Sequence, residues 1–116
     1  MTVGDRVTVG DKYTWKPESG IVVMTYLPRT DITGNVEIAP DGSVAIQNAG
    51  GVKVGSTGTI HGAAISVHRS YLHDSKEYSK GLGTDMVKLL PVFLDTYQRV
   101  GYFPIDYLRL VGSYAN

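Results

Sequence analysis

A succession of short apolar runs and turn sequences occupies residues 34–60, which read GNVEIAPDGSVAIQNAGGVKVGSTGTI. The apolar residues alternate with polar or small ones, which is the period-two pattern of half-buried strands rather than the 3.6-residue period of helices. Pro40-Asp41-Gly42 is typical of a hairpin turn, because proline presets φ, aspartate caps the turn and glycine adopts a positive φ. The stretch therefore predicts strands over 34–39, 43–47, 51–54 and 57–60, with further turns at 49–51 and 55–58.

The same pattern continues on both sides and predicts further strands over Val3–Val9, Gly20–Tyr26 and Ala63–Val67. Apolar residues between Met86 and Tyr97 are also compatible with a helix. Pro91 would stand inside that helix at a cost of roughly 3 kcal/mol. We therefore expect a short helical or extended piece before Pro91 and a strand, Val92–Tyr97, after it. Many short strands joined by glycine-rich turns indicate an all-β fold, and the small size favours a barrel over a sandwich.

Residues 99–111, RVGYFPIDYLRLV, resemble the end of an SH3 domain. In that family a strand leads through Gly-aromatic-Phe/Val-Pro into one 3₁₀ turn that ends in tyrosine, and an alternating last strand follows. The residues that match this pattern are Gly101, Tyr102, Phe103, Pro104, Tyr107, Leu108 and Leu110. The resemblance implies a 3₁₀ turn at 104–107 that lets the last strand close a barrel, with Phe103, Leu108 and Leu110 inside. Pro104 and Tyr107 also match positions of the family's ligand groove.

Two further segments are similar to small barrels of this kind. Gly51–Ile60 resembles the strand, Gly-x-x-Gly turn and strand that open KOW-type barrels, and 92–95 resembles a central strand with its exit aspartate. Together these matches imply a small SH3-like barrel over about residues 50–112, with extra N-terminal strands and a long loop at 68–85. We expect residues 1–49 to form N-terminal β-hairpins, either as an extension of the sheet or as a degenerate second barrel, and 50–116 to form the SH3-like barrel.

Composition excludes several classes of function. The chain of 116 residues has 11 basic and 11 acidic side chains and no cysteine. The absence of cysteine excludes a disulfide scaffold, thiol catalysis and thiolate metal sites. The zero net charge disfavours binding of nucleic acid through bulk charge. The content of 42% hydrophobic residues can support a packed core. No signal-peptide or membrane-span pattern occurs, which predicts a soluble protein, intracellular or in a virion.

The loop at 68–85 is the most unusual stretch, since long loops in small domains tend to carry function. It is either a solvated hairpin or an arm that contacts a partner. Tyrosine and tryptophan are enriched in interface cores, which adds the aromatic residues near the end of the chain. The candidate partner-binding residues are Tyr71, His73, Lys76, Tyr78, Lys80, Tyr102, Pro104 and Tyr107.

Metal binding and catalysis find little support in the sequence. His61, His68, His73 and Asp74 are suitable metal ligands, but their spacing matches no compact ligand template. The chain has no nucleophile elbow, phosphate-binding loop or His-Glu-x-x-His motif. We expect no metal, no cofactor and no enzymatic activity.

Protein–protein contact, including self-association, is the expected function, as an adaptor or as a structural or assembly component. Neutral β proteins of this length that are rich in glycine and tyrosine resemble many bacteriophage products, including virion head and connector parts. The alternative is a KOW-like module that binds nucleic acid or a polymerase. Residues 50–116 carry a mild basic excess that permits this alternative.

Overall fold

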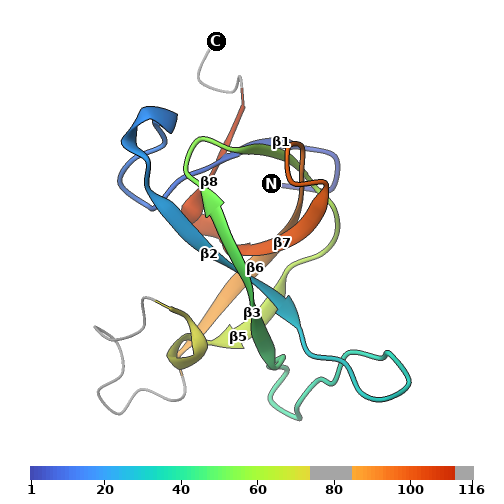
Figure 1. Cartoon of the computed structure of the whole chain (residues 1–116). Helices are drawn as coiled ribbons and strands as arrows, with labels where there is room; N and C mark the ends of the chain where they lie inside the picture. Colours follow the sequence, from blue (N-terminus) through green and yellow to red (C-terminus); the bar gives the residue numbers. More distant parts are fainter. Residues whose placement is uncertain (74–84, 112–116) are drawn as a thin grey trace.

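A computed structural model describes residues 1–73 and 85–111 and confirms the all-β prediction (Figure 1). Its elements, in chain order, are β1 (Arg6–Val9), η1 (Pro17–Ser19), β2 (Val22–Pro28), β3 (Ile46–Lys53), β4 (Thr57–Ile60), β5 (Ile65–His68), η2 (Arg69–Tyr71), β6 (Met86–Leu94), β7 (Arg99–Pro104), η4 (Ile105–Tyr107) and β8 (Leu108–Leu110). The η elements are single turns of 3₁₀ helix.

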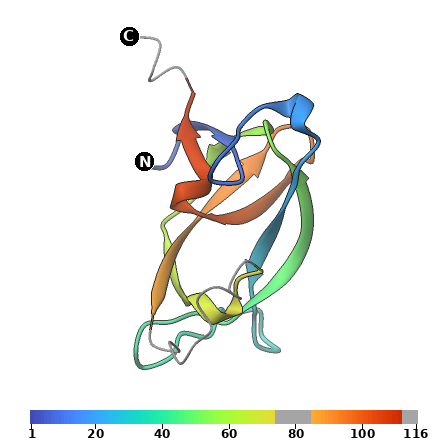
Figure 2. The same ribbon diagram turned by 90° about the vertical axis from the view of Figure 1, so that its left-hand side faces the viewer.

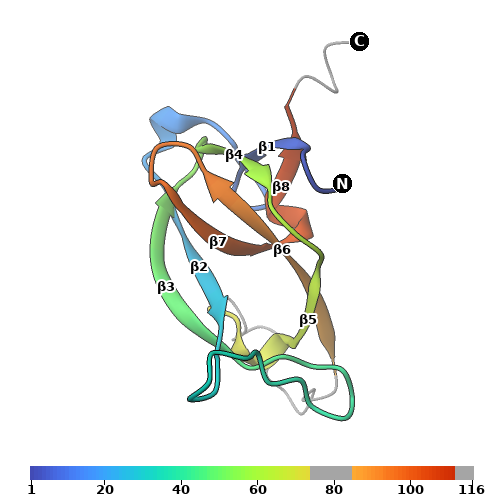
Figure 3. The same cartoon turned by 90° about the vertical axis from the view of Figure 1, so that its right-hand side faces the viewer.

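The strands form one 8-stranded antiparallel sheet in the order β3-β2-β7-β6-β4-β1-β8, with β5 paired to β6 outside this path. Within the described residues the sheet is open, with β3 and β8 as its edges. Figures 2 and 3 show β1, β4 and β8 at one end of the molecule and β5, η2 and the connection after β2 at the other. The N-terminal residues belong to this same sheet. Strand β1 lies between β4 and β8, and β3 runs from residue 46 to residue 53 without a break at the expected boundary between residues 49 and 50.

Strand β6 is extended along its whole length, so the residues before Pro91 are extended rather than helical. One edge of β6 pairs with β7, and the other pairs first with β5 and then with β4. The oxygen of Pro91 accepts a hydrogen bond from the His61 nitrogen, between the two partners. The N–H and C=O of one residue point to the same edge of a strand. The N–H that Pro91 lacks would therefore point to the gap between β5 and β4, where no strand residue needs it as a donor. The strand ends at Leu94 rather than at Tyr97, which lies in the following turn.

The prediction of a turn at 49–51 is wrong. These residues lie inside β3, where the pairing with β2 shifts register between Met24 and Tyr26. Gly50 adopts a φ of 92°, so the glycines allow an irregularity within the strand instead of a reversal. The turn at Pro40-Asp41-Gly42 does form, with the Asp41 carboxylate accepting hydrogen bonds from Ser43. Of the predicted strands beside it, 34–39 is reduced to isolated bridges at Val36 and Ile38, and only the end of 43–47 lies in a strand, β3.

Apolar side chains pack on both faces of the central strands. Leu89 and Leu90, which are neighbours on β6, belong to different clusters, and Tyr102 and Phe103 on β7 divide in the same way. This division follows from the alternation of side chains across a strand. The larger cluster contains Phe103 and Leu108, which are 0% and 5% exposed, and Leu110 packs against it. The predicted 3₁₀ turn and these three inward positions are therefore confirmed.

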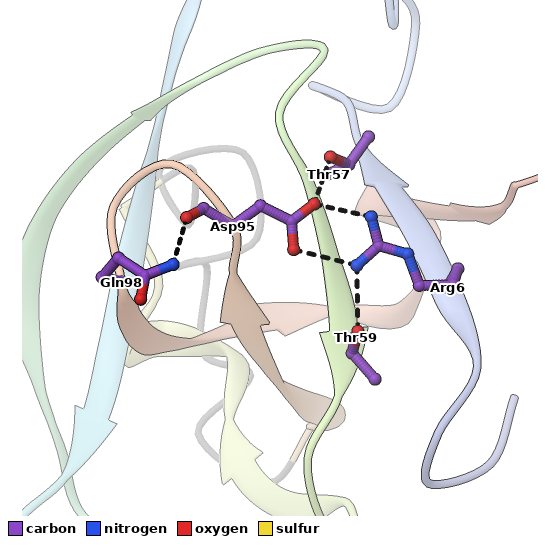
Figure 4. Close-up of polar contacts among 5 residues, drawn as sticks. All are labelled: Arg6, Thr57, Thr59, Asp95 and Gln98. Carbon is purple, nitrogen blue, oxygen red and sulfur yellow. Dashed lines mark hydrogen bonds and ion pairs between the residues drawn. The ribbon is translucent and has the colours of Figure 1, made fainter.

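A polar network joins the ends of three adjacent strands (Figure 4). Both guanidinium nitrogens of Arg6 on β1 contact the Asp95 carboxylate after β6, at 2.9 and 2.6 Å. Thr57 of β4 donates to the same carboxylate at 2.6 Å, and Thr59 accepts from Arg6 at 2.9 Å. Hydrogen bonds from Arg6 and then Thr57 hold the pKa of Asp95 well below its usual range. The network thus links β1 to β4 and β6 through an ionised carboxylate.

Asp95→Asn should lower the melting temperature at neutral pH, because it removes the charge that Arg6 contacts. A carboxylate with a depressed folded pKa stabilises the fold above the pKa it has when unfolded, about 3.9, and this contribution is lost as pH falls further. The difference between wild type and Asp95→Asn should therefore shrink below about pH 4. Thermal melts from pH 7 to pH 3 measure it. In a double-mutant cycle, Arg6→Gln should add little to Asp95→Asn; full additivity contradicts the assignment.

Gly58→Ala should destabilise the fold by about 1–3 kcal/mol, because overpacking against rigid backbone forces strands apart. A Cβ at Gly58 would lie 2.5 Å from the carbonyl oxygen of Phe93 on the neighbouring strand. Gly62→Ala is the matched control, since its Cβ would approach only the Pro91 ring, at 3.4 Å. Urea denaturation compares the two variants. Equal stability of both would show that β4 and β6 can separate at no cost.

Candidate partner-binding groove

A small cavity of about 80 Å³ opens where β2 faces the end of β7 and the turn η4. It is formed by residues that are distant in sequence but adjacent in the fold. Its walls are Val22, Val23, Met24, Tyr26, His73, Pro104 and Tyr107. We call this the β2 groove. It brings together three of the residues that the sequence singled out for partner contact: His73, Pro104 and Tyr107.

Strand pairing and one side-chain contact set the shape of the β2 groove. Tyr26 on β2 lies opposite Tyr102 on β7, which holds the two strands together. The Tyr26 hydroxyl accepts a hydrogen bond from the His73 backbone nitrogen at 2.5 Å, so residue 73 is tied to the sheet. Pro104 ends β7, and its fixed φ suits the turn into η4, which presents Tyr107 to the groove.

The walls of the β2 groove are mostly apolar, with polar groups supplied by tyrosine and histidine. Val22 at the rim is 57% exposed, whereas Val23 and Tyr26 behind it are buried. Burial raises the pKa of Tyr102 beside Tyr26, so this phenol stays neutral. A shallow apolar hollow with a few hydrogen-bonding groups suits one or two apolar side chains of an extended peptide.

The remaining candidates lie elsewhere. Tyr102 is half-buried and packs against the smaller cluster, so it supports Tyr26 without lining the groove. Tyr71 is 61% exposed and lines a separate hollow together with His68 and Asp41. The His68 ring nitrogen Nε2 lies 3.1 Å from the Asp41 carboxylate. Lys76, Tyr78 and Lys80 lie outside the described residues.

The base of the 68–85 loop is closed by a pair of contacts between Arg69 and Asp85. The Arg69 side chain donates to the Asp85 carboxylate at 2.7 Å, and its backbone nitrogen donates to the Asp85 carbonyl at 2.8 Å. These contacts extend the pairing of β5 with β6 by one more step. They fix where the loop leaves and re-enters the sheet.

The candidate metal ligands are dispersed. His61 follows β4 near Phe93, His68 ends β5 beside Asp41, and His73 borders the β2 groove. Asp74 lies outside the described residues. Across residues 1–73 and 85–111, no three histidine or acidic side chains are grouped closely enough to hold a metal ion.

Sequence reasoning missed a second surface. Tyr13, Trp15, Lys16 and Arg109 border a hollow of about 410 Å³ near η1. Arg109 comes from β8, and its guanidinium lies 4.0 Å from the centre of the Trp15 ring. The one tryptophan of the chain was a signal, but nothing in the sequence pairs it with an arginine from the opposite end.

Comparisons of this chain with models of known families, with curated proteins and with solved structures gave no match. Among the residues that the structure describes, no helix has the length and apolar character needed to span a membrane.

Tyr107→Ala should destabilise the fold by about 2 kcal/mol. This is less than the cost of removing a fully buried aromatic side chain, because Tyr107 is only partly buried against the larger cluster. Pro104→Gly should also destabilise, since glycine frees the backbone of the unfolded chain at the turn. Thermal melts of both variants test this. Unchanged melting would mean that the two residues serve a ligand and not the fold.

Proposed function

We propose that the protein is a non-enzymatic binding protein that contacts an extended segment of a protein partner through the β2 groove. The observation that carries the proposal is the convergence of His73, Pro104 and Tyr107 on β2. Two of these residues match the ligand-groove positions implied by the SH3 resemblance. The apolar rim at Val22 offers the kind of surface that partner side chains cover.

The proposal includes an SH3-like organisation of the strands. The order β8-β1-β4-β6-β7 supports it, because the first and last strands of the chain pair with each other. In this arrangement the β2–β3 hairpin is a long insertion between the first strand and the next, and it supplies one wall of the groove. We propose that this contact with a protein partner has a structural or assembly role, such as that of a virion component.

Selection from a displayed library of random linear peptides tests the proposal. We expect bound peptides to share one or two apolar residues at fixed spacing, because the groove has room for few side chains. Val22→Glu should lower the affinity for a selected peptide at least tenfold, since it places a charge on the apolar rim. Fluorescence anisotropy with the labelled peptide measures the affinity.

Val36→Glu is the matched control for this experiment. Val36 is also exposed, at 42%, but it lies in the connection after β2 and not in the groove. It should bind the peptide as the wild type does. Equal loss in both variants, or no selected peptide together with a strictly monomeric protein by light scattering, contradicts the proposed function.

A further inference from the structure

The hollow near η1 has the composition of a binding site for a flat anionic ligand. Its lining residues share aromatic, hydroxyl or cationic side chains, apart from one proline: Thr8, Tyr13, Thr14, Trp15, Lys16, Pro17 and Arg109. We call it the Trp15 pocket. It has a volume of about 410 Å³ and shares no lining residue with the β2 groove.

The pocket is built around a stack. The Trp15 ring lies so close to Gly10 that a Cβ there would come within 2.3 Å of the indole. The Arg109 guanidinium lies over the Trp15 ring, 4.0 Å from the centre of the ring. The indole Nε1 is buried and has no hydrogen-bond partner among the described residues, so the ring keeps this position at an energetic cost. Such a stack fixes Arg109 with its charge at the surface.

The lining of the pocket includes two cationic side chains and no acidic one. Arg109 and Lys16 are exposed, and neither forms an ion pair within the described residues. Three carboxylates occur in the adjoining segments: Asp11 accepts hydrogen bonds from the backbone of Tyr13 and Thr14, Asp106 lies 3.6 Å from Lys12, and the exposed Glu18 of η1 lies outside the lining. No carboxylate lines the pocket, so its field favours an anion.

Tyr13 gives the pocket its preference for an aromatic ligand. Its side chain is 85% exposed, which leaves a ring face free beside the two cations. A carboxylate side chain would use the cations but not this ring, whereas a nucleotide presents both a phosphate and a flat base. The guanidinium plane of Arg109 is a second surface on which a base can stack.

We propose that the Trp15 pocket binds a nucleotide unit of single-stranded nucleic acid, with the base against Tyr13 and the phosphate between Lys16 and Arg109. Because the two cations neutralise one phosphate, the logarithm of the binding constant should fall with the logarithm of salt concentration with a slope of about −0.7. This shallow slope separates a local pocket from binding through bulk charge, which the neutral composition disfavours.

Trp15 reports on binding directly, since it is the only tryptophan in the chain. The full-length protein is titrated with a short oligothymidylate at low salt while tryptophan fluorescence is recorded. We expect saturable quenching, and loss of at least about fivefold in affinity for Tyr13→Ala, because stacking on an aromatic ring contributes this much per base. Tyr13→Phe should retain the affinity. Both substitutions are at an exposed side chain, so the fold tolerates them.

Charge variants complete the test. Lys16→Gln and Arg109→Gln should each weaken binding and make the salt dependence shallower. Arg29→Gln removes one cation just past the end of β2, about 23 Å of strand away from Val22, and should leave the affinity unchanged. The proposal is overturned if oligothymidylate leaves the fluorescence unchanged, if Arg29→Gln loses as much affinity as Arg109→Gln, or if a polyglutamate peptide binds equally well and independently of Tyr13.

Discussion

Every other strand of this protein reaches the sheet through the backbone pairing of β6. One edge of β6 holds β7, which in turn holds the hairpin of β2 and β3, and the other edge holds β5 and β4, with β1 and β8 beyond them. A strand that pairs with two other strands along one edge has a position between them where it pairs with neither. Pro91 stands at that point, where a missing N–H leaves no partner unsatisfied.

The two faces of β6 and β7 carry separate apolar clusters, and this division decides where binding surfaces can form. The larger cluster fixes the end of the molecule that contains β1, β4 and β8, and Arg6 and Asp95 join strands at that end. The smaller cluster contains Tyr26, which is a wall of the β2 groove, and Tyr102 packs against it. The groove also takes Val23 and Tyr107 from the larger cluster, so it depends on packing on both faces.

The β2 groove and the Trp15 pocket differ in chemistry, so one small domain can hold two contacts at once. The groove is apolar with neutral phenols and suits peptide side chains, whereas the pocket presents Lys16 and Arg109 beside exposed aromatic rings. Each combines residues of the sheet with residues of a connecting segment. Connecting segments that a rigid sheet positions often carry binding residues.

The sequence by itself determined the features that depend on neighbouring residues. Period-two runs indicated strands, Pro40-Asp41-Gly42 specified its turn through the Asp41 carboxylate, and residues 99–111 specified β7, η4 and β8. Tertiary structure decided what depends on partners distant in the chain. Pairing with β2 turned the glycines at 50 and 51 into a strand irregularity, and pairing with β7 kept residues 86–90 extended. The stack of Arg109 on Trp15 is of the same kind, because no local pattern records which side chains the pairing of β8 with β1 brings together.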